Sequence, residues 1–202
     1  MYQLRRASSA TGILLAALIV GQAGTLCAQG VAANPNAGPP PLPPATKLEG
    51  FKPAAGSVVR FGYNELGRVG GFLGISVDVR EMRDAHDAAV RGLVVEVRES
   101  EYREERSFVD ADEIPELIKG LDALLDVTTN PTSFQNFEVR YTTRGELQLT
   151  AYNSSDGGMH YAVKAGRVVP AQKTGLNADD MRKLRAMFQS ALDKLNTPTG
   201  KD

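Results

Sequence analysis

The sequence predicts an α+β fold, an antiparallel β-rich body with two amphipathic helices in which a unit of four strands and one helix occurs twice. Three observations predict it. Apolar and polar residues alternate in several short segments, two longer segments carry apolar residues at helical spacing, and these two helical segments align with each other at an offset of 67 residues.

The strands are predicted from alternation between apolar and polar residues. In residues 92–100, Leu93, Val95 and Val97 share one face, whereas Glu96 and Arg98 lie mostly on the other. The segments with such a pattern, bounded by turn residues, are 58–63, 72–80, 92–100, 105–109, 137–143, 146–152, 160–164 and 168–172.

The helices are predicted from apolar stripes with a period of 3.6 residues, and each stripe must be buried against the strands. Acidic residues before both stripes suit the positive end of a helix dipole: Asp110, Asp112 and Glu113 in the first, Asp179 and Asp180 in the second. The stripes are Ile114, Leu117, Ile118, Leu121, Leu124 and Leu125, followed by Met181, Leu184, Met187, Phe188, Ala191, Leu192 and Leu195.

The helix starts also carry local signals. Asn177 is a natural N-cap for the second helix, and Pro115 is tolerated in the first turn of the first one. Without gaps, VDADEIPELIKGLDALL (109–125) aligns on LNADDMRKLRAMFQSAL (176–192). The body is therefore predicted to be a duplication with halves of about 58–127 and 133–196. The pattern leaves open whether the helices pack on one sheet or on two.

The first residues predict export. Arg5 and Arg6 precede the apolar run Ile13–Val20, and residues 1–28 contain no Asp or Glu. Such a run is too short to cross a membrane and is typical of a secretory signal peptide. We expect cleavage after Ala28, a secreted or periplasmic location and no membrane span in the remaining chain, with a signal anchor as the alternative.

Composition divides the rest of the chain. Residues 29–57 are rich in Pro and predict a disordered linker, with a proline-rich ligand at residues 40–44 as the alternative. Residues 58–196 form the predicted α+β domain, and residues 197–202 are expected to be a disordered tail.

Charge and ligand types exclude several classes of site. The net charge is −1, and becomes −3 once residues 1–28 are removed, so no basic field favours nucleic acid. One Cys and two His exclude a Cys-built zinc site and a three-His metal site within one chain. We therefore predict neither a metal nor a cofactor, and the oligomeric state stays open.

The order of four strands and a helix, twice, resembles the PUR-repeat and Whirly group of single-strand nucleic-acid-binding folds. The stretch GRVVPAQKTGLNADDMRKLRAMF is similar in layout to the end of the PC4 coactivator domain. This resemblance implies binding through an exposed sheet face. The outward positions mix charge signs, as in Asp78 with Arg80 and Glu138 with Arg140, so nucleic acid is not expected as the partner.

A second resemblance concerns exported proteins. The stretch SFVDADEIPELIKGLDALL, followed by FEVRYTTRGELQLTAY, resembles secreted bacterial proteins of unknown function. It implies an exported protein and no particular activity.

Residues with catalytic potential form no recognised motif. Glu99, Glu101, Glu104 and Glu105 cluster with arginines, which is typical of a solvated, ion-paired hairpin. The alternative is an exported hydrolase that uses two of these carboxylates. His86 and His160 occur singly, in a polar turn and at a strand start, and are expected to be solvated.

The favoured hypothesis is an exported non-catalytic protein that acts as a binding or interaction module for a protein or a small ligand. The alternatives are the hydrolase and a single-stranded nucleic-acid-binding protein. The expected binding surface is the outward side of the hairpin formed by 137–143 and 146–152, through Arg140, Thr142, Gln148, Thr150 and Tyr152.

Overall fold

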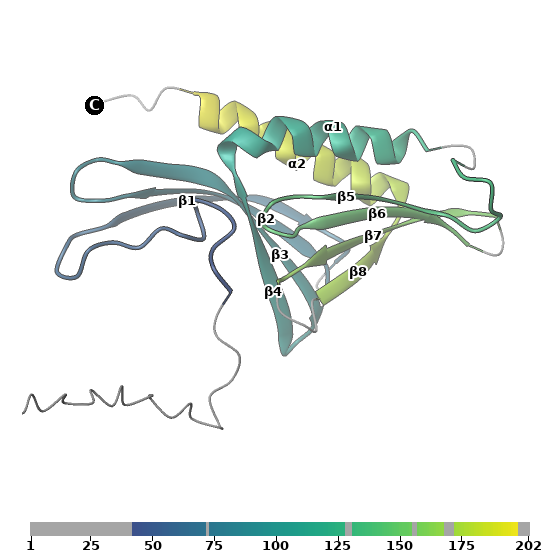
Figure 1. The fold of residues 1–202 in the computed structure, drawn as a ribbon, viewed down its shortest axis with the longest axis horizontal. Helices are drawn as coiled ribbons and strands as arrows, with labels where there is room; N and C mark the ends of the chain where they lie inside the picture. Colours follow the sequence, from purple (N-terminus) through teal and green to yellow (C-terminus); the bar gives the residue numbers. More distant parts are fainter. Residues whose placement is uncertain (1–41, 72, 128–130, 155–156, 168–171, 198–202) are drawn as a thin grey trace, which may run out of the picture. The chain divides into compact units, whose positions relative to one another are not determined.

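The chain runs through four strands and a helix, twice, as the sequence predicts (Figure 1). The computed structural model describes residues 42–197, apart from 72, 128–130, 155–156 and 168–171. The first half contains β1 (Arg60–Val69), β2 (Ile75–Arg83), β3 (Ala89–Ser100), β4 (Arg103–Asp110), a 3₁₀ turn (Ala111–Glu113) and α1 (Ile114–Leu125). The second contains β5 (Glu138–Thr142), β6 (Gln148–Asn153), β7 (Met159–Ala165), β8 (Gln172–Leu176) and α2 (Ala178–Asn196).

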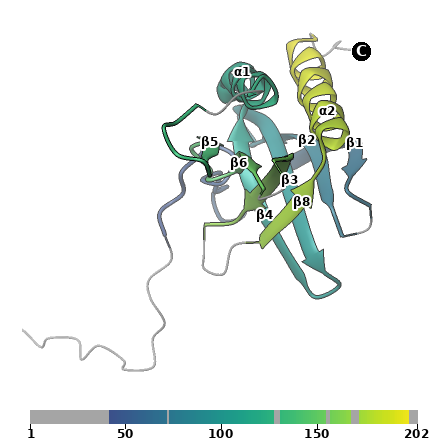
Figure 2. The same cartoon turned by 90° about the vertical axis from the view of Figure 1, so that its right-hand side faces the viewer.

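Each half forms its own antiparallel sheet, in the orders β1-β2-β3-β4 and β5-β6-β7-β8. The helices lie side by side on one side of the molecule (Figure 2). α1 contacts β5 and β6, whereas α2 contacts mainly β1, so each helix covers strands of the other half. The helices therefore pack on two sheets rather than on one, which the sequence pattern left open.

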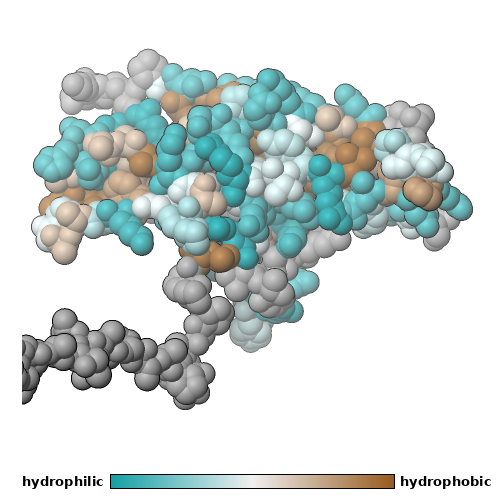
Figure 3. Space-filling view, viewed as in Figure 1, coloured by the Kyte–Doolittle hydropathy of each residue, from teal (hydrophilic) through white to brown (hydrophobic). Residues whose placement is uncertain are grey.

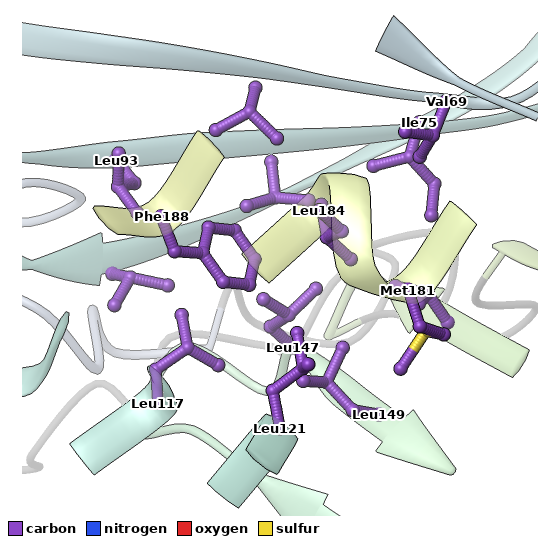
Figure 4. Packing of buried hydrophobic residues seen from close by; sticks show 14 of the residues in the cluster. Val69, Ile75, Leu93, Leu117, Leu121, Leu147, Leu149, Met181, Leu184 and Phe188 are labelled. Carbon is purple, nitrogen blue, oxygen red and sulfur yellow. The ribbon is translucent and has the colours of Figure 1, made fainter. Parts of the chain in front are cut away.

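The core joins both halves. The inward residues of β3, Leu93, Val95 and Val97, are fully buried, as are the stripes of both helices in large part. Figure 4 shows Phe188 of α2 in the same apolar cluster as Leu93 of β3 and Leu117 of α1. One apolar core is therefore built from residues of both halves.

The helix starts confirm two sequence signals, and a third residue has a further role. The Asn177 side chain accepts a hydrogen bond from the Asp180 N–H at 2.8 Å, so it is the N-cap of α2. Pro115 lies in the first turn of α1. Asp110 precedes the first helix as predicted, but it makes no side-chain cap bond there, because its carboxylate accepts hydrogen bonds from other backbone groups.

Those groups belong to the segment predicted as a linker. Asp110 accepts hydrogen bonds from the backbone N–H groups of Lys47 and Leu48, at 2.9 and 3.0 Å, and Leu48 is 2% exposed. Glu49 pairs with Arg167 at 3.1 Å. The packed body thus begins before residue 58, the predicted boundary. Residues 1–41, which include the predicted signal peptide, lie outside the described residues.

The two helices are tied together by an ion pair as well as by apolar contact. Arg185 of α2 donates two hydrogen bonds to the Asp122 carboxylate of α1, at 2.6 and 3.0 Å. These bonds lower the pKa of Asp122 and raise that of Arg185. Both side chains are more than a third exposed, so solvent screens the pair and its main effect is to fix how the helices align.

Candidate functional site

The predicted binding residues share one face of the second sheet. Arg140 lies opposite Thr150 in the β5–β6 ladder, Thr142 lies opposite Gln148, and Tyr152 lies on the same face one step further along. The alternate positions of these strands point into the core, as with Leu149 and Ala151, which are fully buried. The structure therefore brings all five side chains to one outward face.

The polar groups of this face are largely engaged with each other. Arg140 forms an ion pair with Glu138, and the Gln148 side-chain amide donates to the Thr142 hydroxyl at 3.5 Å. Thr150 is only 5% exposed. The centre of this face consequently offers a ligand few polar groups without a hydrogen-bond partner.

Its far corner is more open. The rings of Tyr152 and His160 stack with centroids 5.7 Å apart, beside a hollow of about 550 Å³. Met159 and Asp180 also line this hollow, and Asp180 pairs with Lys183. His160 and the predicted residue Tyr152 therefore form one aromatic corner. The sequence pattern around His160 did not indicate this contact.

A second surface, which the sequence analysis did not select, lies on β1. Phe61 and Tyr63 are 64% and 80% exposed, although they belong to a regular strand. Residues 60–65 are exposed on both sides of the strand. We call residues 60–65 the β1 arm. Figures 1 and 3 show it at the end of the sheet that extends past the helices, with brown apolar surface among hydrophilic side chains.

The β1 arm is also an open sheet edge. β1 pairs with β2 on one side, and no other strand among the described residues pairs with it. A bulge between Glu65 and Gly67 ends its regular register. An exposed edge that carries apolar side chains can pair with another extended chain.

Next to the arm lies a hollow of about 350 Å³, lined by Phe61, Tyr63, Arg80 and neighbouring residues. Tyr63 lies opposite Arg80 of β2, and Arg80 pairs with Asp78 at 3.3 Å. On the other face Glu81 binds Arg83 and Arg91, and these contacts lower the pKa of Glu81. Both charge signs therefore occur beside the two aromatic rings.

The carboxylate cluster of β3 and β4 is an ion-pair network. Arg98 contacts Glu96 at 3.2 Å and Glu104 at 2.7 Å, and Arg106 contacts the same two carboxylates at 2.9 and 3.5 Å. Hydrogen bonding from Arg98 lowers the pKa of Glu104. A general acid requires a raised carboxyl pKa, so the environment of Glu104 suits a paired surface charge better than acid catalysis.

Within the described ranges, no three His, Cys, Asp or Glu side chains are grouped so that they could hold a metal ion. No helix there is long and apolar enough to span a membrane. No protein-family model matches the sequence, and a search of curated proteins finds no significant match.

Proposed function

We propose that this chain is an exported, non-catalytic interaction module that binds an extended stretch of polypeptide along the outer edge of β1. The observation that carries the proposal is an open sheet edge with Phe61 and Tyr63 exposed beside it. In this mode of recognition, main-chain hydrogen bonds supply affinity and alternate side chains of the ligand supply specificity.

The surroundings of the arm favour polypeptide over nucleic acid. Bases stack on aromatic rings within a positively charged groove, whereas Tyr63 has the paired charges Arg80 and Asp78 as neighbours. The hollow beside Phe61 and Tyr63 can accept apolar ligand side chains. The ion pair of Arg80 with Asp78 on the face of Tyr63 suits the mixed charges of a protein.

The corner at Tyr152 and His160 supports a second candidate, the binding of a small planar ligand. Its stacked rings and the adjoining hollow of about 550 Å³ favour it. The wide hollow and the paired polar groups around it make it the weaker candidate, because small-ligand sites are usually enclosed and mostly apolar.

A random peptide library displayed on phage tests the proposal directly. We expect the chain to select peptides with alternating apolar residues, which pair with β1. The double substitution Phe61→Ser and Tyr63→Ser should weaken their binding by more than about tenfold, since aromatic anchors at interfaces commonly carry that much. Binding is measured by surface plasmon resonance, and hydrogen exchange should show new protection of the amides in residues 60–65.

The matched controls are a tyrosine and a phenylalanine that are somewhat more exposed, elsewhere on the chain: Tyr102 at 92% and Phe134 at 74%. Tyr102→Ser and Phe134→Ser should leave peptide affinity unchanged. The proposal is wrong if affinity survives the β1 substitutions, or if Tyr152→Ser abolishes it instead, because the peptide would then bind the face of the second sheet.

The exported part of the proposal is based on residues 1–28, through Arg5, Arg6 and the apolar run Ile13–Val20. Mass spectrometry of the protein recovered from its native host, fractionated by compartment, should find a chain that begins at Gln29 outside the cytoplasm. A cytoplasmic chain that retains residues 1–28 would overturn export and make single-stranded nucleic acid the leading alternative.

A further inference from the structure

Among the described strands, the edge strands β1, β4 and β5 are not protected equally. The other edge of the first sheet, β4, exposes the charged side chains of Arg103, Glu104 and Arg106. Edge strand β5 likewise exposes Glu138 and Arg140. Charged side chains along an edge discourage pairing with another chain. The β1 arm exposes charged side chains at its two ends, Arg60 and Glu65, but carries the aromatic rings of Phe61 and Tyr63 between them.

We infer that the partner of the β1 arm is a second copy of this chain, joined by antiparallel pairing of the two β1 strands about Gly62. This inference depends on the proposed function, because it names the polypeptide that occupies the same edge. The resulting order, β4-β3-β2-β1-β1-β2-β3-β4, is one continuous sheet across a two-fold axis.

Geometry restricts the possible registers. A two-fold axis perpendicular to the sheet keeps the outer faces of both copies on the same side, so opposed residues must have numbers with an even sum. The regular part of the arm runs from Arg60 to Glu65, before the bulge. Its midpoint lies between Gly62 and Tyr63, so the pairing is centred on one of these two residues.

The side chains decide between them. Centred on Gly62, the pairing places Phe61 opposite Tyr63 of the second copy, and the symmetry repeats this aromatic contact. It also places Arg60 opposite Asn64, so no like charges meet. Centred on Tyr63, it would set Phe61 opposite Glu65 and replace the two Phe61–Tyr63 pairs with a single Tyr63–Tyr63 pair. Aromatic pairs across strands are among the more stabilising sheet contacts.

A second copy also suits this edge better than an arbitrary peptide. Its own Phe61 and Tyr63 are equally exposed, so one association covers four exposed rings. Gly62 at the centre carries no side chain on the opposite face, where a Cβ would meet only Glu81 atoms at 3.9 Å or more. The two backbones can therefore approach without a steric barrier at the axis.

The oligomeric state of the exported chain tests the inference. We expect analytical ultracentrifugation to show a reversible dimer, and Phe61→Ser with Tyr63→Ser to raise its dissociation constant by more than about tenfold. Tyr102→Ser should leave the dimer unchanged. A chain that is monomeric throughout, or a dimer unaffected by the β1 substitutions, would overturn the inference.

Disulfide formation tests the register, since cleavage after Ala28 leaves a chain without Cys. Gly62→Cys should cross-link rapidly to its own copy, because residues at the axis face each other within disulfide reach. Asn64→Cys, on the same face of the strand, should not, since the two Cys would lie four residues apart along the strands, roughly 13 Å. The opposite pattern would overturn pairing about Gly62.

The two proposals fail in distinguishable ways. Library peptides that bind β1 of a monomeric chain would keep the proposed function and remove the second copy as its partner. Peptides that bind elsewhere would remove the proposed function itself, together with the inference that depends on it.

Discussion

The substitution Phe188→Ala is expected to lower the free energy of unfolding by about 3–5 kcal/mol, the usual cost of removing a large buried aromatic side chain. Phe188 is fully buried on α2, in one apolar cluster with Leu93 of β3 and Leu117 of α1 (Figure 4). The lost ring leaves a cavity between elements of both halves. Because well-packed helices and sheets relax only partly, that cavity stays largely unfilled.

Urea unfolding followed by circular dichroism measures this effect. The control is Phe134→Ala, since Phe134 is 74% exposed and its truncation should change the free energy by less than about 0.5 kcal/mol. We expect one cooperative transition in both variants, because both halves share the core. Equal losses in the two variants, or separate transitions for the two halves, would contradict the packing described for Phe188.

Much of this core is visible in the sequence. Alternation in residues 92–100 predicts that Leu93, Val95 and Val97 share a buried face, and the structure buries all three. The stripe of α2 likewise predicts burial of Phe188 and Leu184. These predictions succeed because the period of a pattern depends only on local backbone geometry.

The arrangement of the elements could not be predicted in the same way. An apolar stripe on α1 shows that the helix is covered, but not by which strands. α1 packs on β5 and β6, and α2 packs mainly on β1, so each helix covers strands of the other half. The apolar stripes alone fit equally well with each helix covering its own half, so this exchange depends on long-range packing. Gly120 of α1 marks the contact, because a Cβ there would lie 2.3 Å from the Tyr141 ring of β5.

Of the two candidate surfaces, the sequence predicts one and misses the other. Period-two alternation predicts that Arg140, Thr150 and Tyr152 lie on the same side of the hairpin, and the ladder places them so, but Thr150 is buried rather than exposed. The same reasoning missed the β1 arm, because Phe61 and Tyr63 alternate as core residues do. Only the tertiary structure shows that the described part of the chain leaves both rings exposed. The sequence shows the alternation, but not whether the apolar side of the strand is covered.

Asp110 carries the second large effect, and Asp110→Ala should lower the free energy of unfolding by roughly 2–4 kcal/mol. Its carboxylate is almost fully buried and accepts hydrogen bonds from the backbone N–H groups of Lys47 and Leu48. Without it, either two donors lose their partner or the segment detaches and exposes Leu48. The sequence predicts a linker for residues 29–57, because no local pattern reveals a contact with a carboxylate 62 residues further along the chain.

Trypsin distinguishes a docked segment from a released one, because it cleaves the Lys47–Leu48 bond, whose N–H Asp110 holds at 3.0 Å. We expect cleavage after Lys47 to be slow in the native chain and clearly faster in Asp110→Ala. Asp112→Ala is the control: this carboxylate is 55% exposed, and its ion pairs with Arg144 and with Lys47 itself should each contribute about 1 kcal/mol or less. If both variants are cleaved and destabilised alike, surface charge rather than the buried contact of Asp110 holds residues 46–49 against the body.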